Sequence, residues 1–339
     1  YFKIKKISTI INKNFFKKLF LIFSTFIELR SLITNKKINN DDIIYSRATY
    51  CGLGILGAKL IYKNKFPMII TESHRYFKEK EPFIKLIKSY LIKTNLKYSD
   101  LIITITQKHK KNYLNLLNLN NNKINVLHDG VEIEKFNKIN NSQKKIKKKL
   151  GISTNKRIIM YVGDLRKEKG INTIISTAKS FKSNLKLLFY IIGGTISEID
   201  KIKKKLKKEK INNIKLLGYI KHETIPFYLK SADILIMPLS KKSDPSWGSP
   251  LKLFEYMASK RPILCSKIPS ICEVVSDNEV TFFKSDNSNE FYKQILYILK
   301  NYSKSNNKAI NAFKKVKKYT WDHRVKHMLY QVKLIYNSK

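Results

Sequence analysis

The sequence predicts an α/β protein with two domains, each built around a parallel sheet. The chain has 339 residues, enough for two ordinary domains, and 43% of them are hydrophobic, which allows two cores. In both halves, short apolar runs typical of buried strands alternate with helical patterns, as in parallel sheets. A run rich in lysine and asparagine, residues 138–150, separates the halves. We expect this run to be a solvated linker.

The first 40 residues are expected to be largely helical. Their apolar run, Leu19 to Ile27, is flanked by lysines and is too short to span a bilayer. It also lacks the small-residue cleavage site of a signal peptide. Two alternatives remain from these residues, a buried helix and a helix that lies on a membrane surface.

The rest of the first half contains predicted strands at 42–47, 66–74 and 98–106, with helices at 50–62 and from 107 onward. Ligands of open parallel sheets bind beyond the carboxyl ends of the strands. Glu72, His74 and Arg75 stand at such an end. The predicted helix at 50–62 contains three glycines whose spacing matches no phosphate-binding loop, so we expect them to allow close packing against a strand: Gly52, Gly54 and Gly57.

The second half opens with a strand that ends at Gly163, followed by a turn to Gly170 and a helix from Ile171. The turn carries Arg166 and Lys169. A strand, a glycine turn, cations and a helix N-terminus together form a site for an anion.

Two further strand ends in this half are candidate ligand contacts. The strand at 186–192 ends in Gly193 and Gly194, which let a ligand approach the backbone. The strand at 214–218 leads into Tyr219 and Ile220. We expect His222, which follows, to serve the surface or a helix cap rather than chemistry.

Another helix of this half is predicted to begin in the sequence SPLKLFEYMA, residues 249–258. Ser249 is a good N-cap and Pro250 suits the first helical position, while Leu251 begins a buried stripe. Lys252 lies in the first turn, where a cation is unfavourable unless an anion binds there. Glu255 is within reach of the same ligand. An ordinary amphipathic helix explains the ten residues equally well.

These ten residues and the KRPIL that follows (260–264) resemble the nucleotide-binding segment of the GT-B glycosyltransferases of retaining family 4, and weaker likeness extends over roughly residues 41–335. The resemblance implies two Rossmann-like domains facing a cleft. It implies an acceptor-side domain at 1–137, the linker at 138–150, a nucleotide-sugar domain at 151–319 and a C-terminal helix at 320–339 that crosses back. The family's first glycine-rich loop is not found before Asp42, so we expect the first domain to be incomplete at its start.

The resemblance also implies a function, which is sugar transfer from a UDP- or GDP-sugar to an acceptor hydroxyl with retained configuration. The acceptor is expected to be a lipid-linked glycan or a cell-surface polysaccharide. Catalytic roles fall on His74, Lys169 and Glu255, for the donor sugar, the leaving diphosphate and the ribose. No cofactor and no metal are expected, since the chain has no Asp-x-Asp motif. The donor is expected to contact Gly163, Arg166, Gly193, Gly194, Tyr219, Ile220, Ser249, Pro250, Leu251 and Lys252.

In the second half, two positions depart from the family pattern. Asp164 stands where the family has an arginine, and Trp247 stands where many members have a first glutamate. Arg166 is a candidate substitute for the arginine, and Asp244 for the glutamate. These departures leave a catalytically inactive, GT-B-like scaffold or partner subunit as the main alternative function.

Three explanations account for the formal net charge of +43: binding to nucleic acid, binding to an anionic membrane surface, or base-composition drift toward lysine codons in an AT-rich genome. Lysine is spread along the whole chain and arginine occurs only seven times, so we expect no specific nucleic-acid reading. A basic protein that binds nucleic acid through its net charge is a less favoured alternative. The three cysteines show no paired spacing, which suits a reducing cytosol. We therefore expect a cytoplasmic protein, attached peripherally to the inner face of the membrane.

Overall fold

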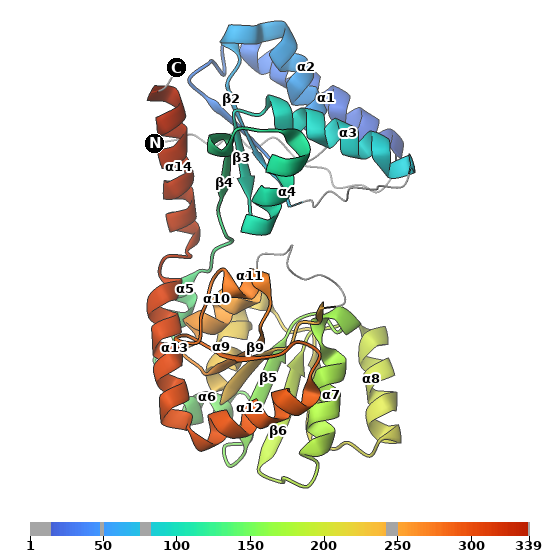
Figure 1. Cartoon of the computed structure of the whole chain (residues 1–339), viewed down its shortest axis with the longest axis vertical. Coiled ribbons are helices and arrows are strands. Elements are labelled where there is room, and N and C mark those ends of the chain that lie inside the picture. The colour runs from blue at the N-terminus through green and yellow to red at the C-terminus, as the bar shows by residue number, and fades with distance from the viewer. Residues whose placement is uncertain (1–14, 48–50, 75–82, 242–249, 338–339) are drawn as a thin grey trace. The chain divides into compact units, whose positions relative to one another are not determined.

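The structure is a computed structural model, and it describes residues 15–47, 51–74, 83–241 and 250–337 (Figure 1). The chain divides into two compact units, residues 1–127 and residues 128–339. Each unit contains one parallel sheet, with four strands in the first and six in the second. The α/β class predicted from the alternating pattern is thereby confirmed.

The first unit carries its strands in the order β1-β2-β3-β4, all parallel. Strands β2 and β3 are completely buried, which matches their uninterrupted apolar sequence. The elements in chain order are α1 (Phe15–Thr34), β1 (Ile43–Ser46), α2 (Cys51–Tyr62), β2 (Met68–Glu72), α3 (Phe83–Tyr98), β3 (Leu101–Thr104), α4 (Gln107–Leu117) and β4 (Ile124–Val126).

The glycines of α2 pack against helices, which corrects the expectation that they face a strand. A Cβ atom on Gly54 would lie 2.4 Å from the backbone oxygen of Ile22 in α1. One on Gly52 would lie 2.0 Å from the side chain of Asn95 in α3. Small residues at these positions therefore let three helices approach one another closely. Among the described residues, no helix is long and apolar enough to cross a membrane.

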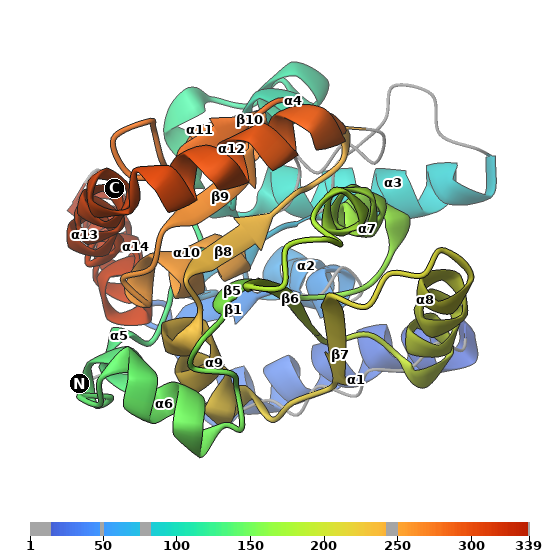
Figure 2. The same cartoon turned by 90° about the horizontal axis from the view of Figure 1, so that it is seen from below.

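The second unit has the strand order β10-β9-β8-β5-β6-β7 (Figure 2). Helices cover both faces of this sheet. Alternate residues of β5 point to opposite cores: Ile158 and Met160 join the cluster that includes α10, whereas Ile159 and Tyr161 join the cluster that includes α7 and α12. Its elements are α5 (Ile133–Asn137), α6 (Gln143–Lys149), β5 (Arg157–Val162), α7 (Ile171–Ser180), β6 (Leu187–Ile192), α8 (Ile196–Lys208), β7 (Ile214–Gly218), α9 (Ile225–Ser231), β8 (Ile234–Met237), α10 (Leu251–Ala258), β9 (Ile263–Ser266), α11 (Pro269–Cys272), β10 (Thr281–Phe283), α12 (Ser288–Lys300), α13 (Tyr302–Val316) and α14 (Trp321–Asn337).

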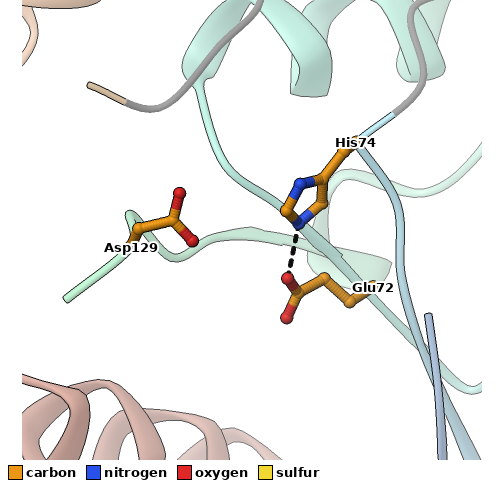
Figure 3. A group of neighbouring side chains, drawn as sticks. All are labelled: Glu72, His74 and Asp129. Atoms are coloured by element: carbon orange, nitrogen blue, oxygen red, sulfur yellow. Dashed lines mark hydrogen bonds and ion pairs between the residues drawn. The ribbon is translucent and has the colours of Figure 1, made fainter. Parts of the chain in front are cut away.

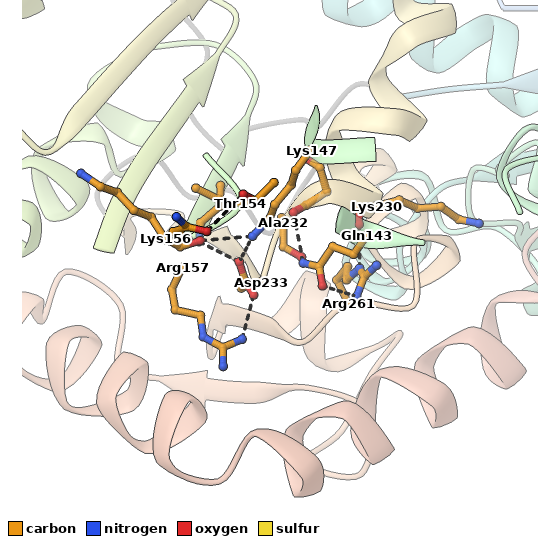
Figure 4. A network of polar contacts seen from close by, with 12 residues as sticks. Gln143, Lys147, Thr154, Lys156, Arg157, Lys230, Ala232, Asp233 and Arg261 are labelled. Atoms are coloured by element: carbon orange, nitrogen blue, oxygen red, sulfur yellow. Dashed lines mark hydrogen bonds and ion pairs between the residues drawn. The ribbon is translucent and has the colours of Figure 1, made fainter. Parts of the chain in front are cut away.

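The run at 138–150 differs from the solvated linker that its composition predicts, because it contains α6 and belongs to the second unit. The ammonium group of Lys147 is buried and lies 2.7 Å from the carboxylate of Asp233 (Figure 4). That carboxylate also accepts hydrogen bonds from Arg157 (3.0 Å) and from the backbone N–H of Ile158 (2.8 Å). Beside it, the Gln143 side chain donates to the backbone of Ala232. Lysines dominate the run, but one of them is a core residue.

Candidate functional site

The carboxyl ends of β5, β6 and β7 meet at one edge of the second sheet and are joined there by glycines. The N–H of Gly163 donates to Ile192 (2.9 Å), and the N–H of Gly193 donates to Gly218 (2.7 Å). Gly193 has φ +113°, and a Cβ atom there would lie 2.3 Å from the oxygen of Gly163. A Cβ on Gly194 would meet the side chain of Leu165 at the same distance. The absence of a side chain at these half-buried positions therefore lets the segments after β5 and β6 approach each other closely. The predicted approach of a ligand to this backbone stays a prediction.

The turn between β5 and α7 is docked onto the end of β8. Gly170 adopts a left-handed conformation (φ +78°), and a Cβ atom there would lie 1.6 Å from the oxygen of Pro238. The backbone N–H of Ser240 also donates to Glu168 in the turn. Lys169 ends the short 3-10 helix Lys167–Lys169 and is half-buried. A close contact between two backbones thus holds the turn that carries Lys169 at the carboxyl end of β8.

Arg166 is engaged by two carboxylates, which bears on its expected role in binding an anion. Its guanidinium lies 2.9 Å from the carboxylate of Asp164 and 3.1 Å from that of Glu168. The hydrogen bond to Asp164 is the largest cause that raises the pKa of Arg166. These pairs are exposed and therefore weak, so an anionic ligand can compete for the guanidinium. Lys169 is the cation of this turn that best fits the predicted role.

Helix α10 begins at Leu251, one residue later than predicted, because Pro250 occupies the N-cap position. Ser249 lies outside the described residues, as do Asp244 and Trp247. Leu253, Phe254 and Met257 are buried, whereas the side chain of Leu251 is 46% exposed, so Leu251 is not part of the buried stripe that the sequence predicts.

Tyr256 anchors α10 onto the sheet. Its hydroxyl is buried and accepts a hydrogen bond from the backbone N–H of Val162 (3.0 Å), at the end of β5. Burial raises the pKa of this hydroxyl, so it remains protonated. Glu255, the preceding residue, therefore belongs to a helix that is fixed to the carboxyl end of β5.

Glu255 is held by cationic or polar partners at both of its oxygens. The Lys252 ammonium lies 3.1 Å from Oε2, and Nε2 of His222 lies 2.9 Å from Oε1. His222 begins a 3-10 helix after β7, and its pairing with Glu255 was missed by the sequence reasoning, which assigned it to the surface or a cap. No local signal could have found it, since 33 positions separate the two residues. An ionised carboxylate retains lone pairs for a ligand hydroxyl beside these partners.

Tyr219 and Ile220 follow β7 and lie on the loop that carries His222. The ring of Tyr219 is 81% exposed, and Ile220 packs partly buried against the core of α10. The exposed aromatic ring of Tyr219 is available for stacking with a planar group.

In the first unit, polar side chains at the end of β2 and of its neighbour β1 surround the buried carboxylate of Glu72. Nε2 of His74 lies 2.5 Å from Oε1 of Glu72 (Figure 3). Arg47 also lies 3.3 Å from Oε1, and the hydroxyl of Tyr45 contacts Oε2. Tyr45 and Arg47 belong to the neighbouring strand end and were not predicted. Arg75 lies outside the described residues.

A polar surface hollow of about 620 Å³ lies beside α7 and α12, and none of the predicted donor contacts lines it. Its lining includes Asn172, Ser176 and Ser288. The predicted donor site therefore lies at the carboxyl ends of the strands of the second sheet and not in this hollow.

Comparison with known proteins gives agreement at the levels of family and fold. The family model of the glycosyl transferases group 1 matches residues 142–316. This range contains Lys169, Glu255 and the glycines that follow β5 and β6: Gly163, Gly193 and Gly194. An uncharacterized glycosyltransferase of Methanocaldococcus jannaschii, MJ1069, is 28% identical over 269 residues, which cover 77% of this chain. The chain spans 66% of that relative's length, just under two thirds.

A second relative and a solved structure extend the likeness into the first unit. The UDP-Gal:alpha-D-GlcNAc-diphosphoundecaprenol alpha-1,3-galactosyltransferase of Escherichia coli is 25% identical over 309 residues, covering 86% of this chain and 77% of that one. The crystal structure of Anabaena Alr3699/HepE in complex with UDP has a TM-score of 0.74 at 14% identity, covering 91% of this chain and 81% of that one. The GT-B fold class is thereby confirmed.

Proposed function

The chain belongs to the glycosyl transferases group 1, and on that basis we propose that it transfers a glycosyl group from a nucleotide-sugar to an acceptor hydroxyl. The observation that supports the proposal is that Glu255 is held at both carboxylate oxygens by Lys252 and His222, on a helix that Tyr256 fixes to the carboxyl end of β5. The glycines that follow β5 and β6, and Lys169 in the turn after β5, also lie at carboxyl ends of strands in this sheet. We propose that the reaction retains the anomeric configuration, as the resemblance to family 4 implies.

The proposed chemistry is stabilisation of a departing nucleoside diphosphate. Negative charge develops on the leaving phosphate, and preorganised cations and helix N–H groups stabilise it there. Lys169 and Lys252 would supply the cations, and α10 its N-terminus. Glu255, fixed between Lys252 and His222, would accept hydrogen bonds from the ribose hydroxyls. We propose a UDP- or GDP-sugar as the donor; the Anabaena neighbour was solved in complex with UDP.

The experiment that tests the donor site is a thermal-shift panel with UDP, GDP, ADP and their sugar conjugates. A ligand at a hundred times its Kd stabilises a protein by about 2.7 kcal/mol, which is readily detected. We expect one nucleotide to stabilise the wild type and Glu255→Ala to lose that stabilisation. Glu223→Ala, an exposed change on the same loop as His222, is the matched control and should retain it. The stabilising conjugate is then the donor for a transfer assay.

Two outcomes would redirect the proposal. Stabilisation by no nucleotide would contradict a donor site. Nucleotide binding without transfer to any lipid-linked or polysaccharide acceptor would favour the inactive scaffold. The observation that favours this alternative is that Arg166, the candidate substitute for the family's arginine, is paired with the carboxylates of Asp164 and Glu168.

We further propose a lipid-linked or polysaccharide acceptor and peripheral attachment to the inner face of the cytoplasmic membrane. The net charge of +43 attracts anionic headgroups, and Phe23 and Ile27 of α1 expose 62% and 48% of their surface. The Escherichia coli relative is named for a diphosphoundecaprenol-linked substrate.

Co-sedimentation with vesicles tests this attachment. We expect binding to phosphatidylglycerol-containing vesicles to exceed binding to neutral ones, and to weaken in the double variant Phe23→Ser/Ile27→Ser. Leu334→Ser, on the exposed face of α14, is the control. Equal binding to neutral and anionic vesicles would count against the proposal.

A further inference from the structure

We propose that Glu72 is the positioning residue of His74: it holds the proton on Nε2 and leaves Nδ1 as a hydrogen-bond acceptor for a hydroxyl of the bound sugar. The identity of that ligand rests on the proposed function. The state of the imidazole ring is argued from Glu72 and Arg47, which contact its Nε2 and belong to the first unit, and it can be measured without that ligand.

The fold brings the cluster together through strand register. Strands β1 and β2 are parallel neighbours with Tyr45 opposite Ile70 and Ser46 opposite Thr71, so both strands end at the same edge. The side chain of Glu72, at the end of β2, is 1% exposed. A buried carboxylate requires donors to compensate for its lost hydration. Tyr45, Arg47 and His74 converge on its two oxygens.

The contact between Glu72 and His74 determines which ring nitrogen carries the proton. Oε1 and Nε2 are 2.5 Å apart, which requires a proton between them. Tyr45 and Arg47 both act as donors to Glu72, so the carboxylate is ionised and can only accept. Nε2 therefore donates. The Arg47 guanidinium also lies 3.1 Å from Nε2, but a nitrogen that donates to Glu72 has no lone pair for it.

The consequence concerns the other edge of the ring. Nδ1 points away from Glu72 in Figure 3, and the His74 side chain is 34% exposed. A neutral imidazole protonated at Nε2 presents a lone pair at Nδ1, which accepts a hydrogen bond from a hydroxyl but not from a carbonyl or a phosphate oxygen. This residue would thus select hydroxyl donors, the groups that a sugar offers.

The ring state can be measured without any ligand. The chain has six histidines, so a sample with ¹⁵N-labelled histidine gives few ring signals, and His74→Ala identifies those of His74. At about pH 8 we expect a slowly exchanging proton on Nε2 and none on Nδ1. A proton on Nδ1, alone or together with one on Nε2, would overturn the proposal.

Variants of Glu72 test the cause of that state. Glu72→Ala should abolish the slow exchange of the Nε2 proton, whereas Glu28→Ala, at an exposed position of α1, should preserve it. If Glu72→Ala fails to fold, Glu72→Gln retains an acceptor oxygen without the charge, and its Nε2 proton should exchange faster than in the wild type. An exchange rate equal to that of the wild type in the variant that folds would show that Glu72 does not hold the ring.

A double-mutant cycle separates positioning from simple structural support. With the donor found by thermal shift, we expect Glu72→Ala to lower kcat by up to about 100-fold, the scale of a misplaced group, and His74→Ala by a similar factor. In the His74→Ala background the further change at Glu72 should cost nothing, because its effect passes through the ring. Independent, multiplicative losses would refute the positioning role. Absence of transfer in the wild type would contradict the proposed function alone, since the ring state is measured separately.

Discussion

Replacing Asp233 with alanine should destabilise the second unit by about 4 kcal/mol. The carboxylate is buried and compensates the buried ammonium of Lys147 at 2.7 Å, while also accepting from Arg157 and from the backbone of Ile158. After the substitution, the ammonium group of Lys147 still donates to the backbone oxygen of Lys156, but it no longer has a carboxylate partner at Asp233. Breaking a buried pair from one side costs about 3–5 kcal/mol, and the orphaned N–H of Ile158 is a part of that cost.

Urea unfolding followed by tryptophan fluorescence measures this effect. Both tryptophans lie after residue 127, so their fluorescence reports the second unit. A loss of about 4 kcal/mol lowers the folded-to-unfolded ratio by about a thousandfold, and the midpoint should fall with little change in slope. Asp200→Ala, at an exposed position of α8, is the control and should shift the midpoint by less than about 0.5 kcal/mol.

A second substitution tests the physical reason. If the uncompensated ammonium causes most of the loss, Lys147→Met in the Asp233→Ala background should recover stability, because no charge is then buried alone. A midpoint for Asp233→Ala equal to that of Asp200→Ala would refute the reasoning. A double variant no more stable than Asp233→Ala would show that the cost comes from the lost backbone contact instead.

Three further predictions concern single positions. Lys169→Ala should lower the transfer rate by about 10- to 1000-fold in the donor assay, whereas the exposed Lys182→Ala should not; an unchanged rate would remove Lys169 from the mechanism. Gly193→Ala should cost at least about 1–3 kcal/mol in urea unfolding, since its Cβ would lie 2.3 Å from the oxygen of Gly163; unaltered stability would contradict the backbone geometry. Burial lowers the pKa of His109 to about 4, so the unfolded chain, with a pKa of about 6.5, takes up the proton first. Stability of the first unit should therefore fall between about pH 6.5 and 4, by up to about 3 kcal/mol, and His109→Gln should lack that portion of the pH dependence in urea unfolding followed by circular dichroism.

Elements of the second unit follow closely from local sequence. Helix α7 begins at Ile171 as predicted, and β6 ends at Ile192, directly before the predicted glycines. Apolar runs, glycine turns and caps act over a few residues, so a sequence pattern contains most of the information that they need. The start of α10 differs by one residue, because Pro250 occupies the N-cap rather than the first turn.

The composition of a segment was a poorer guide to its environment. Residues 138–150 read as a solvated run because lysine dominates them, yet Lys147 is 4% exposed. Whether a lysine is buried depends on a partner, and its partner Asp233 lies 86 positions away. Likewise, Arg166 reads as a free cation in sequence but is engaged by carboxylates in the folded turn.

The sequence alone determined the α/β class and the order of strands and helices along the chain. It also placed Lys169 in the turn after β5 and Gly193 directly after β6. The ligand contacts of both residues stay a prediction. Only the tertiary structure decided the order of strands within each sheet and the pairs built across it. Tyr45 meets Glu72 because the neighbouring strands β1 and β2 end side by side. His222, which follows β7, meets Glu255 of helix α10, which lies 33 positions further along the chain. Local propensity acts over a few residues, whereas burial and charge compensation depend on which distant segments pack together.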